Sequence, residues 1–242
     1  MQIQTFDWIA MVILALVFPV FGMWKHRRLE GRVARAIPNA RTLHYRQVLL
    51  IEWSTSIVLF LLWRSADRGW SELGFGTSAD LWTWIGWGVT AAVIALLVVQ
   101  TVAVLRDAEK IAAVRQQVEP LRALIPTTPR EARLFNWVSL SAGICEEFLY
   151  RGYAIAVLAA LSNVWMGVLI SSVIFGLGHA YQGPKGIAKT GLVGLAMAGL
   201  YQLTGSLWAP MLLHAAVDVN SGYLGRRALA TREPSPDVRA AA

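Results

Sequence analysis

The chain has 242 residues, of which 56% are hydrophobic and only 15% are charged. An average soluble domain carries about 25% charged residues, so the composition excludes an ordinary soluble protein. The net charge is +7, but the basic residues lie between and after the apolar runs, so a positive-inside membrane pattern explains them and nucleic-acid binding is not expected. The single cysteine, Cys145, excludes an internal disulfide and any site built on several cysteines.

Three apolar runs in the first half of the chain are long enough to cross a bilayer, or nearly so, since a crossing takes about 20 helical residues. The first covers residues 6–24, with Pro19 as a candidate kink, and a basic loop at 25–46 follows it. The second covers residues 47–63 and carries Glu52 near its start, which we expect at interface depth. The third is Leu81–Leu105. Residues 106–133 mix both charges and are typical of a cytoplasmic amphipathic helix.

A new helix is predicted to begin at Thr128 and Pro129, because a threonine followed by proline at the first helical position is a start signal. The remaining apolar runs are then residues 134–158, 164–179, 187–203 and 207–223. The run at 187–203 contains glycines that permit close helix contact in lipid, namely Gly191, Gly194 and Gly199. The last run has Pro210 near its start.

The pattern predicts an all-α protein, a polytopic transmembrane helical bundle of about seven spans, within a range of six to eight. Residues 1–133 would form N-terminal helices with the amphipathic segment, 134–225 a core that carries the polar motifs, and 226–242 a cytoplasmic tail. The loop charges place the N-terminus outside and the C-terminus in the cytoplasm. We expect a multi-pass integral membrane protein, in a bacterial inner membrane.

Charged residues interrupt the run at 134–158. Glu146, Glu147 and Arg151 each cost about 2.5–3.5 kcal/mol at a helix centre, and such residues are functional-site hypotheses by default. Glu147 and Arg151 stand four apart and can pair on one helix face. Glu146 is rotated by about 100° from Glu147, so we expect it to point elsewhere. The alternative is that the Glu147–Arg151 pair is purely structural.

Polar residues in two later runs could meet Glu146. His179 ends the run at 164–179, and His214 and Asp218 stand four apart on one face of the last run. Each could instead be a helix–helix hydrogen-bond partner or part of a polar seam. Because they lie on different spans and have no other obvious charged partners in lipid, we expect them to share one cavity. A carboxylate and two imidazoles are suited to activating water.

These motifs resemble the CPBP family, which comprises CAAX proteases and bacteriocin-processing enzymes and is also called Abi. The resemblance rests on Glu-Glu-x-x-x-Arg at 146–151, Phe-x-x-x-His from Phe175 to His179, and His-x-x-x-Asp from His214 to Asp218. It covers residues 136–222 or so, and three motifs in order are far more specific than one. It implies an intramembrane endopeptidase with a helical-bundle fold.

The resemblance also implies roles for the site residues. Glu146 with His179 would activate the water, and His214 with the residue at 218 would form the oxyanion site. The supporting residues would be Glu147, Arg151 and Phe175. Some members have asparagine at the last position, whereas this chain has Asp218, whose ionised carboxylate would repel an oxyanion. Asp218 is therefore expected to be protonated, to orient His214, or to serve another role.

The cofactor stays open at this stage. Glu146, His179 and His214 could supply three ligands to a zinc ion with an open fourth position. No metal is favoured, because Glu146 cannot easily be both ligand and base. The expected partners are a peptide or membrane-protein substrate and the lipid bilayer. A proton-coupled transporter and a catalytically silent membrane scaffold are the alternative functions, although no inverted repeat of the transporter kind is visible.

Overall fold

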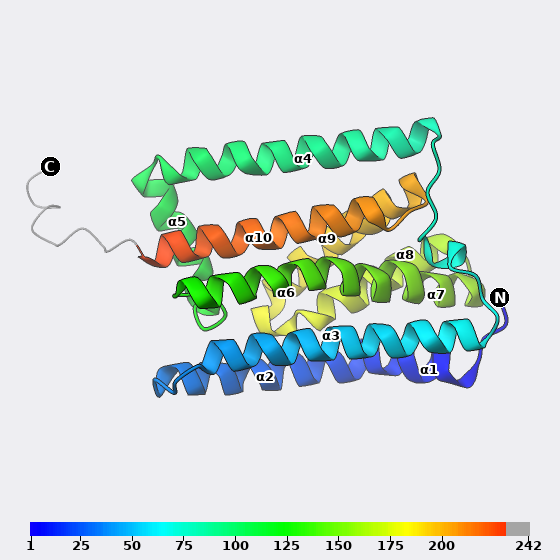
Figure 1. Cartoon of the computed structure of the whole chain (residues 1–242), viewed down its shortest axis with the longest axis horizontal. Coiled ribbons are helices and arrows are strands. Elements are labelled where there is room, and N and C mark those ends of the chain that lie inside the picture. The colour runs from blue at the N-terminus through cyan, green and yellow to red at the C-terminus, as the bar shows by residue number, and fades with distance from the viewer. Residues whose placement is uncertain (231–242) are drawn as a thin grey trace, which may run out of the picture.

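The computed structural model describes residues 1–230, and these form helices joined by short connections, with no strand among them (Figure 1). The predicted all-α helical bundle is therefore confirmed. The helices in chain order are α1 Thr5–Val12, the π-helical η1 Ile13–Val17, α2 Phe18–Ala34, α3 Ala40–Ser65, η2 Ser71–Leu73, α4 Leu81–Leu105, α5 Ala108–Val118, η3 Glu119–Leu121, α6 Pro129–Glu147, the π-helical η4 Phe148–Ala154, α7 Ile155–Leu161, α8 Val164–Gly178, η5 Ala180–Gln182, α9 Gly183–Thr204 and α10 Trp208–Ala230.

The continuous rod of α6, η4 and α7 lies at the centre of the bundle. α6 packs against α10 on one side and against α3 on the other, while α4 lies outside α10 and α9 (Figure 1). The largest core cluster gathers around η4, where Phe148, Tyr150 and Tyr153 are almost fully buried. The Glu-Glu-x-x-x-Arg motif at 146–151 therefore extends into the most enclosed part of the bundle.

Three helical stretches are long and apolar enough to cross a membrane on their own, namely Thr5–Ala34, Ala40–Ser65 and Leu81–Leu105. α8 and α9 pass the same test only together, and they meet at a bend of 58°. The central rod and α10 do not pass, because the polar residues of the motifs interrupt them. The sequence predicted about seven spans, and residues 1–230 contain three to four that qualify by length and composition.

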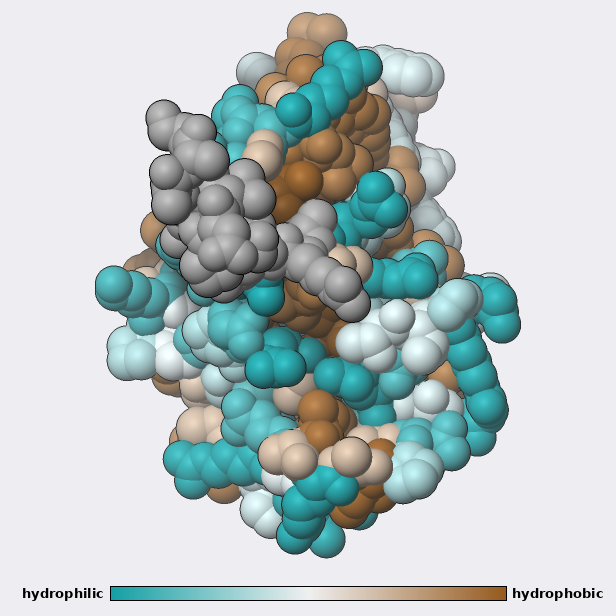
Figure 2. Space-filling view, turned by 90° about the vertical axis from the view of Figure 1, so that its left-hand side faces the viewer, coloured by the Kyte–Doolittle hydropathy of each residue, from teal (hydrophilic) through white to brown (hydrophobic). Residues whose placement is uncertain are grey.

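The predicted loop at residues 25–46 was wrong. α2 continues to Ala34 and α3 begins at Ala40, so only a short turn separates them. The basic residues of this region consequently lie on helix surfaces. The hydrophilic end of the bundle in Figure 2 contains this turn, together with α5 and the end of α10.

The predicted C-terminal tail begins as helix. α10 continues through Arg226 and Arg227 to Ala230. The rest of the predicted tail, residues 231–242, lies outside the described residues. The proposed division at residues 133 and 134 stays a prediction, although α3 packs directly on α6 across it.

A buried ion pair ties the start of the chain to the central rod. Both oxygens of Asp7 accept hydrogen bonds from Arg68, at 2.9 and 2.7 Å, and Tyr153 on η4 donates to Asp7 at 2.7 Å. Arg68 also donates to the carbonyl of Gln2 and lies 4.8 Å from the centre of the Trp63 ring. This pair connects α1, the loop after α3 and the central rod.

Asp7→Asn is expected to lower the free energy of unfolding by about 3–5 kcal/mol, because Arg68 would then be buried without a counter-charge. Asp67→Asn is the matched control, since it removes the same charge from an exposed neighbour of Arg68 whose φ of 55° suits asparagine. Thermal unfolding of both variants in one detergent measures the difference. Equal melting temperatures would show that the ion pair does not stabilise the fold.

Candidate active site

The acidic residues are placed by a helix whose start is fixed by a capping box. The Thr128 hydroxyl accepts a hydrogen bond from the backbone N–H of Glu131 at 3.2 Å, and Glu131 in turn accepts from the backbone N–H groups of Thr127 and Thr128. Pro129 occupies the first turn, as the sequence predicted. Burial raises the pKa of Glu131, but these hydrogen bonds outweigh burial and hold it below its usual value.

Gly143 lets α10 approach α6 closely, one turn before the acidic pair. A Cβ atom at this position would lie 2.7 Å from the carbonyl oxygen of Met211 and 2.9 Å from the backbone nitrogen of Ala215. Real Cβ atoms essentially never make such short contacts, so only glycine permits this separation. His214, which precedes Ala215, is thereby brought against the end of α6.

Glu147 is the most buried member of the site, with a fully enclosed side chain. Its Oε1 atom lies 2.7 Å from Nδ1 of His214 and 3.0 Å from Nη1 of Arg151. Arg151 also donates to the carbonyl of Gly194 on α9, at 3.1 Å. The predicted Glu147–Arg151 pair is present, but Glu147 does more than hold Arg151, because it also binds the imidazole of α10.

Glu146 lies near the same imidazole. Its Oε2 atom is 3.8 Å from Nε2 of His214, and Asp218 Oδ2 is also 3.8 Å from that nitrogen. Glu146 thus lies near His214, one of the residues it was expected to meet, whereas the contact of Glu147 with the same ring was not expected. An imidazole has nitrogens on two sides of its ring, so His214 can face Glu147 with one and Glu146 with the other.

His179 lies beside this group without a contact to Glu146 among those the structure gives for residues 1–230. Its Nδ1 atom is 3.0 Å from the carbonyl oxygen of Phe175. Because a carbonyl can only accept, Nδ1 is the donor and Nε2 is the nitrogen available to a substrate or water. The Phe175 ring contacts both imidazoles, with centroid separations of 4.9 Å to His179 and 5.9 Å to His214. His179 also interacts electrostatically with Asp218.

Phe175 fills the centre of the site. Its ring lies 4.1 Å from the guanidinium carbon of Arg151 and packs edge-on against Tyr150 at 5.1 Å. A guanidinium over an aromatic face is attracted by the ring's negative charge density. Phe175 therefore holds α8 against the central rod and contacts both Arg151 and the two imidazoles.

Glu52 is a site residue that the sequence reasoning missed. The sequence reasoning gave it no part in the site, but this residue of α3 is only 9% exposed and its Oε2 atom has no hydrogen-bond partner among the described residues. It interacts electrostatically with Glu146, Asp218 and His214. The signal available in the sequence was its position inside a run that otherwise holds no acidic residue.

The sequence offered three candidate metal ligands, and their grouping can be compared with that of a metal centre. Among residues 1–230, no three or more histidines, cysteines, aspartates and glutamates are grouped so that they could hold a metal ion. Glu146, His179 and His214, the candidate ligands from the sequence, are included in this finding. Both Nδ1 atoms of the histidines are held, one by Glu147 and one by the carbonyl of Phe175, so the Nε2 atoms are the ones left to face a ligand.

Comparison with protein families identifies residues 129–220, less than half of the chain, as matching the family described as type II CAAX prenyl endopeptidase Rce1-like. The matched segment begins at the first residue of α6 and ends two residues after Asp218, so it contains every residue of the predicted motifs. The predicted resemblance to CPBP intramembrane proteases is thus confirmed. Comparisons with curated proteins and with solved structures found no match.

Gly143→Ala is expected to lower activity at least tenfold, because an added Cβ must push α10 away and lengthen the Glu147–His214 contact. A displacement of 1 Å at a catalytic group can cost about a hundredfold in rate. Gly199→Ala is the matched control, since a Cβ there meets open space. Peptide cleavage by both variants in one detergent tests this, and equal rates would show that this close approach is not required.

Proposed function

We propose that this chain, whose residues 129–220 match the Rce1-like family of type II CAAX prenyl endopeptidases, is an endopeptidase that cleaves peptide bonds with a water activated by Glu146. The observation that carries the proposal is the position of His214 Nε2, at 3.8 Å from both Glu146 and Asp218 while Nδ1 is held by Glu147. Such a spacing exceeds a direct hydrogen bond and leaves the two carboxylates facing one imidazole nitrogen.

Glu146 is the general base in this proposal. Its Oε2 atom is buried and has no hydrogen-bond partner among the described residues, so its acceptor capacity is available to a water. The carboxylate takes one proton from the water, and the oxygen attacks the peptide carbonyl carbon. The resulting tetrahedral intermediate then breaks its C–N bond as Glu146 returns the proton to the leaving amine.

His214 stabilises the oxyanion, and Glu147 is its positioning residue. In its imidazolium form, His214 donates Nδ1–H to Glu147, which fixes the ring, and Nε2–H is then the donor that can face the oxyanion. Arg151 balances the negative charge of Glu147 in this buried setting. His179, with Nδ1 donating to Phe175, offers Nε2 to orient the water or relay its proton.

The substrate enters from the side of Asp218. Side-chain exposure rises from 0% at Glu147 to 9% at His214, 21% at Glu146 and 39% at Asp218. The exposed surfaces of α3 and α4 carry many large apolar side chains, as helices facing lipid do. A peptide or membrane-protein segment therefore reaches the carboxylates from the Asp218 side.

The proposal assigns no step to a metal or another cofactor. By the positive-inside rule, the basic end of the bundle faces the cytoplasm.

Glu146→Gln is expected to lower peptide cleavage by about 10²- to 10⁴-fold, because an amide cannot accept the water proton. The variant keeps the size and hydrogen-bonding capacity of the side chain, so its melting temperature should stay close to that of the parent chain. Glu109→Gln, on the exposed surface of α5, is the matched control. The measurement is cleavage of a membrane-anchored reporter peptide, with and without a C-terminal prenylated CAAX sequence.

The outcomes separate the proposed protease from its alternatives. Loss of cleavage with an unchanged melting temperature supports a general base. Substrate uptake into vesicles that the same change abolishes would identify a transporter. A fall in melting temperature for a chain that cleaves nothing would identify a scaffold. Unchanged cleavage by Glu146→Gln would refute the assignment of Glu146.

Asp218→Asn is expected to keep cleavage within tenfold of the parent chain or to raise it. An amide can still contact His214 across the same space, and it removes a negative charge that would repel the oxyanion. Asp218→Ala should lower cleavage at least tenfold more than Asp218→Asn does, because it removes one of the two polar groups beside Nε2 of His214. If the asparagine variant were as inactive as the alanine variant, the carboxylate itself would be required at this position.

A further inference from the structure

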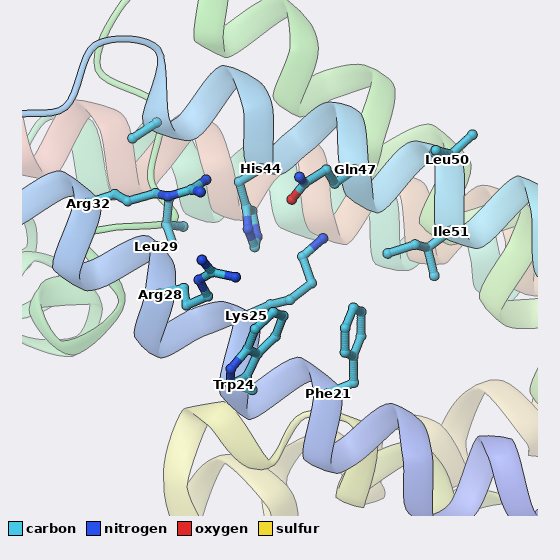
Figure 3. Close-up of a pocket in the computed structure, with 11 residues that line it drawn as sticks. Phe21, Trp24, Lys25, Arg28, Leu29, Arg32, His44, Gln47, Leu50 and Ile51 are labelled. Atoms are coloured by element: carbon cyan, nitrogen blue, oxygen red, sulfur yellow. The ribbon is translucent and has the colours of Figure 1, made fainter.

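A pocket separate from the active site lies between α2 and α3, near the turn that joins them (Figure 3). Its volume is about 360 Å³. α2 contributes Phe21, Lys25, Arg28, Leu29 and Arg32, which recur at the spacing of one helix face, together with the adjacent Trp24. α3 contributes Ala40, His44, Gln47, Leu50 and Ile51.

The pocket is lined by three cationic side chains, together with the polar side chains of His44 and Gln47. Lys25, Arg28 and Arg32 point into the space between the helices, with His44 opposite them on α3 (Figure 3). No acidic residue lines the pocket, and no ion pair is given for these three cations within residues 1–230. The nearest acid on α2, Glu30, pairs with His26 instead. Positive charges gathered without counter-charges favour an anionic ligand.

The lining of the pocket changes from basic to apolar along the helix axis. Its end toward the turn holds Arg28, Arg32 and His44, and its other end holds Phe21 and Ile51, where the apolar stretch of α2 begins (Figure 3). Arg28 stacks over the ring of Trp24, at 4.8 Å, which fixes the guanidinium near the boundary. An aromatic and basic boundary of this kind is typical of the interface between lipid tails and headgroups.

We propose that this pocket binds one anionic phospholipid, with the phosphate between Arg28, Arg32 and His44 and an acyl chain along Phe21 and Ile51. A small anion such as free phosphate would leave the apolar end of the pocket unused. A neutral amphiphile would leave three cations without a partner. Only a molecule with both parts matches the whole lining. Arginine side chains suit the phosphate because their donors form a fixed fork.

The test is native mass spectrometry of the full chain released from micelles that contain either phosphatidylglycerol or phosphatidylcholine. We expect one tightly retained phosphatidylglycerol and no retained phosphatidylcholine. Arg28→Gln with Arg32→Gln should weaken retention about 30-fold, since each basic residue near an anionic headgroup contributes about a fivefold effect. Arg27→Gln with Arg35→Gln, which changes the same net charge outside the pocket, should leave retention unchanged.

Two further experiments distinguish binding of a whole lipid from binding of its charged group alone. Trp24→Ala preserves every charge of the chain and should still weaken retention, because it removes the apolar wall beside Arg28. Inorganic phosphate in excess should not displace the lipid. Equal retention of the two lipids, equal effects of the two double arginine variants, or displacement by phosphate would each overturn the proposal. All arms are run on Glu146→Gln chains as well, so the result does not depend on protease activity.

Discussion

The contact between Glu147 and His214 is the constraint on which the rest of the site depends. A carboxylate buried without water must find its partners in the protein, because removing one partner of such a group costs about 3–5 kcal/mol. Oε1 of Glu147 takes both the imidazole of α10 and the guanidinium of Arg151. This single oxygen therefore connects α6, η4 and α10, and Arg151 carries the connection on to α9 through Gly194.

The π-helical segment η4 gives this network its shape. It begins at Phe148, directly after the acidic pair, and all of its residues are buried. A π-helix is wider than an α-helix and is found most often at functional sites. Its position means that the site residues face their partners at the end of α6, while Tyr150, Arg151 and Tyr153 face α8, α9 and Asp7. The same segment supports the site and holds the N-terminus.

The sequence predicted the helical class, and it predicted that Glu146, His179, His214 and Asp218 would meet, because charged groups in an apolar bundle have few alternatives to one another. Glu146 and Asp218 lie 3.8 Å from His214, while the hydrogen bond given for His179 goes to Phe175. It did not predict Glu52, since a single acid near a predicted span end is ordinary. Nor did it predict that Glu146 and Glu147 share His214, because helical rotation describes directions on one helix and not the two nitrogens of a partner's ring. The close approach at Gly143 involves residues of α10 that are distant in the sequence, so no local sequence pattern could predict it.

The basic residues after the first span show that a charge pattern does not specify local structure. The sequence assigned them to a loop, yet Lys25, Arg28 and Arg32 lie on one face of α2 and meet α3 across a pocket. A positive-inside pattern depends on the count of basic residues, which is the same for a loop and a helix. Only the helix places these charges at fixed spacing beside apolar side chains. The same basic residues that contribute to the positive-inside count therefore also line the pocket proposed to bind one lipid.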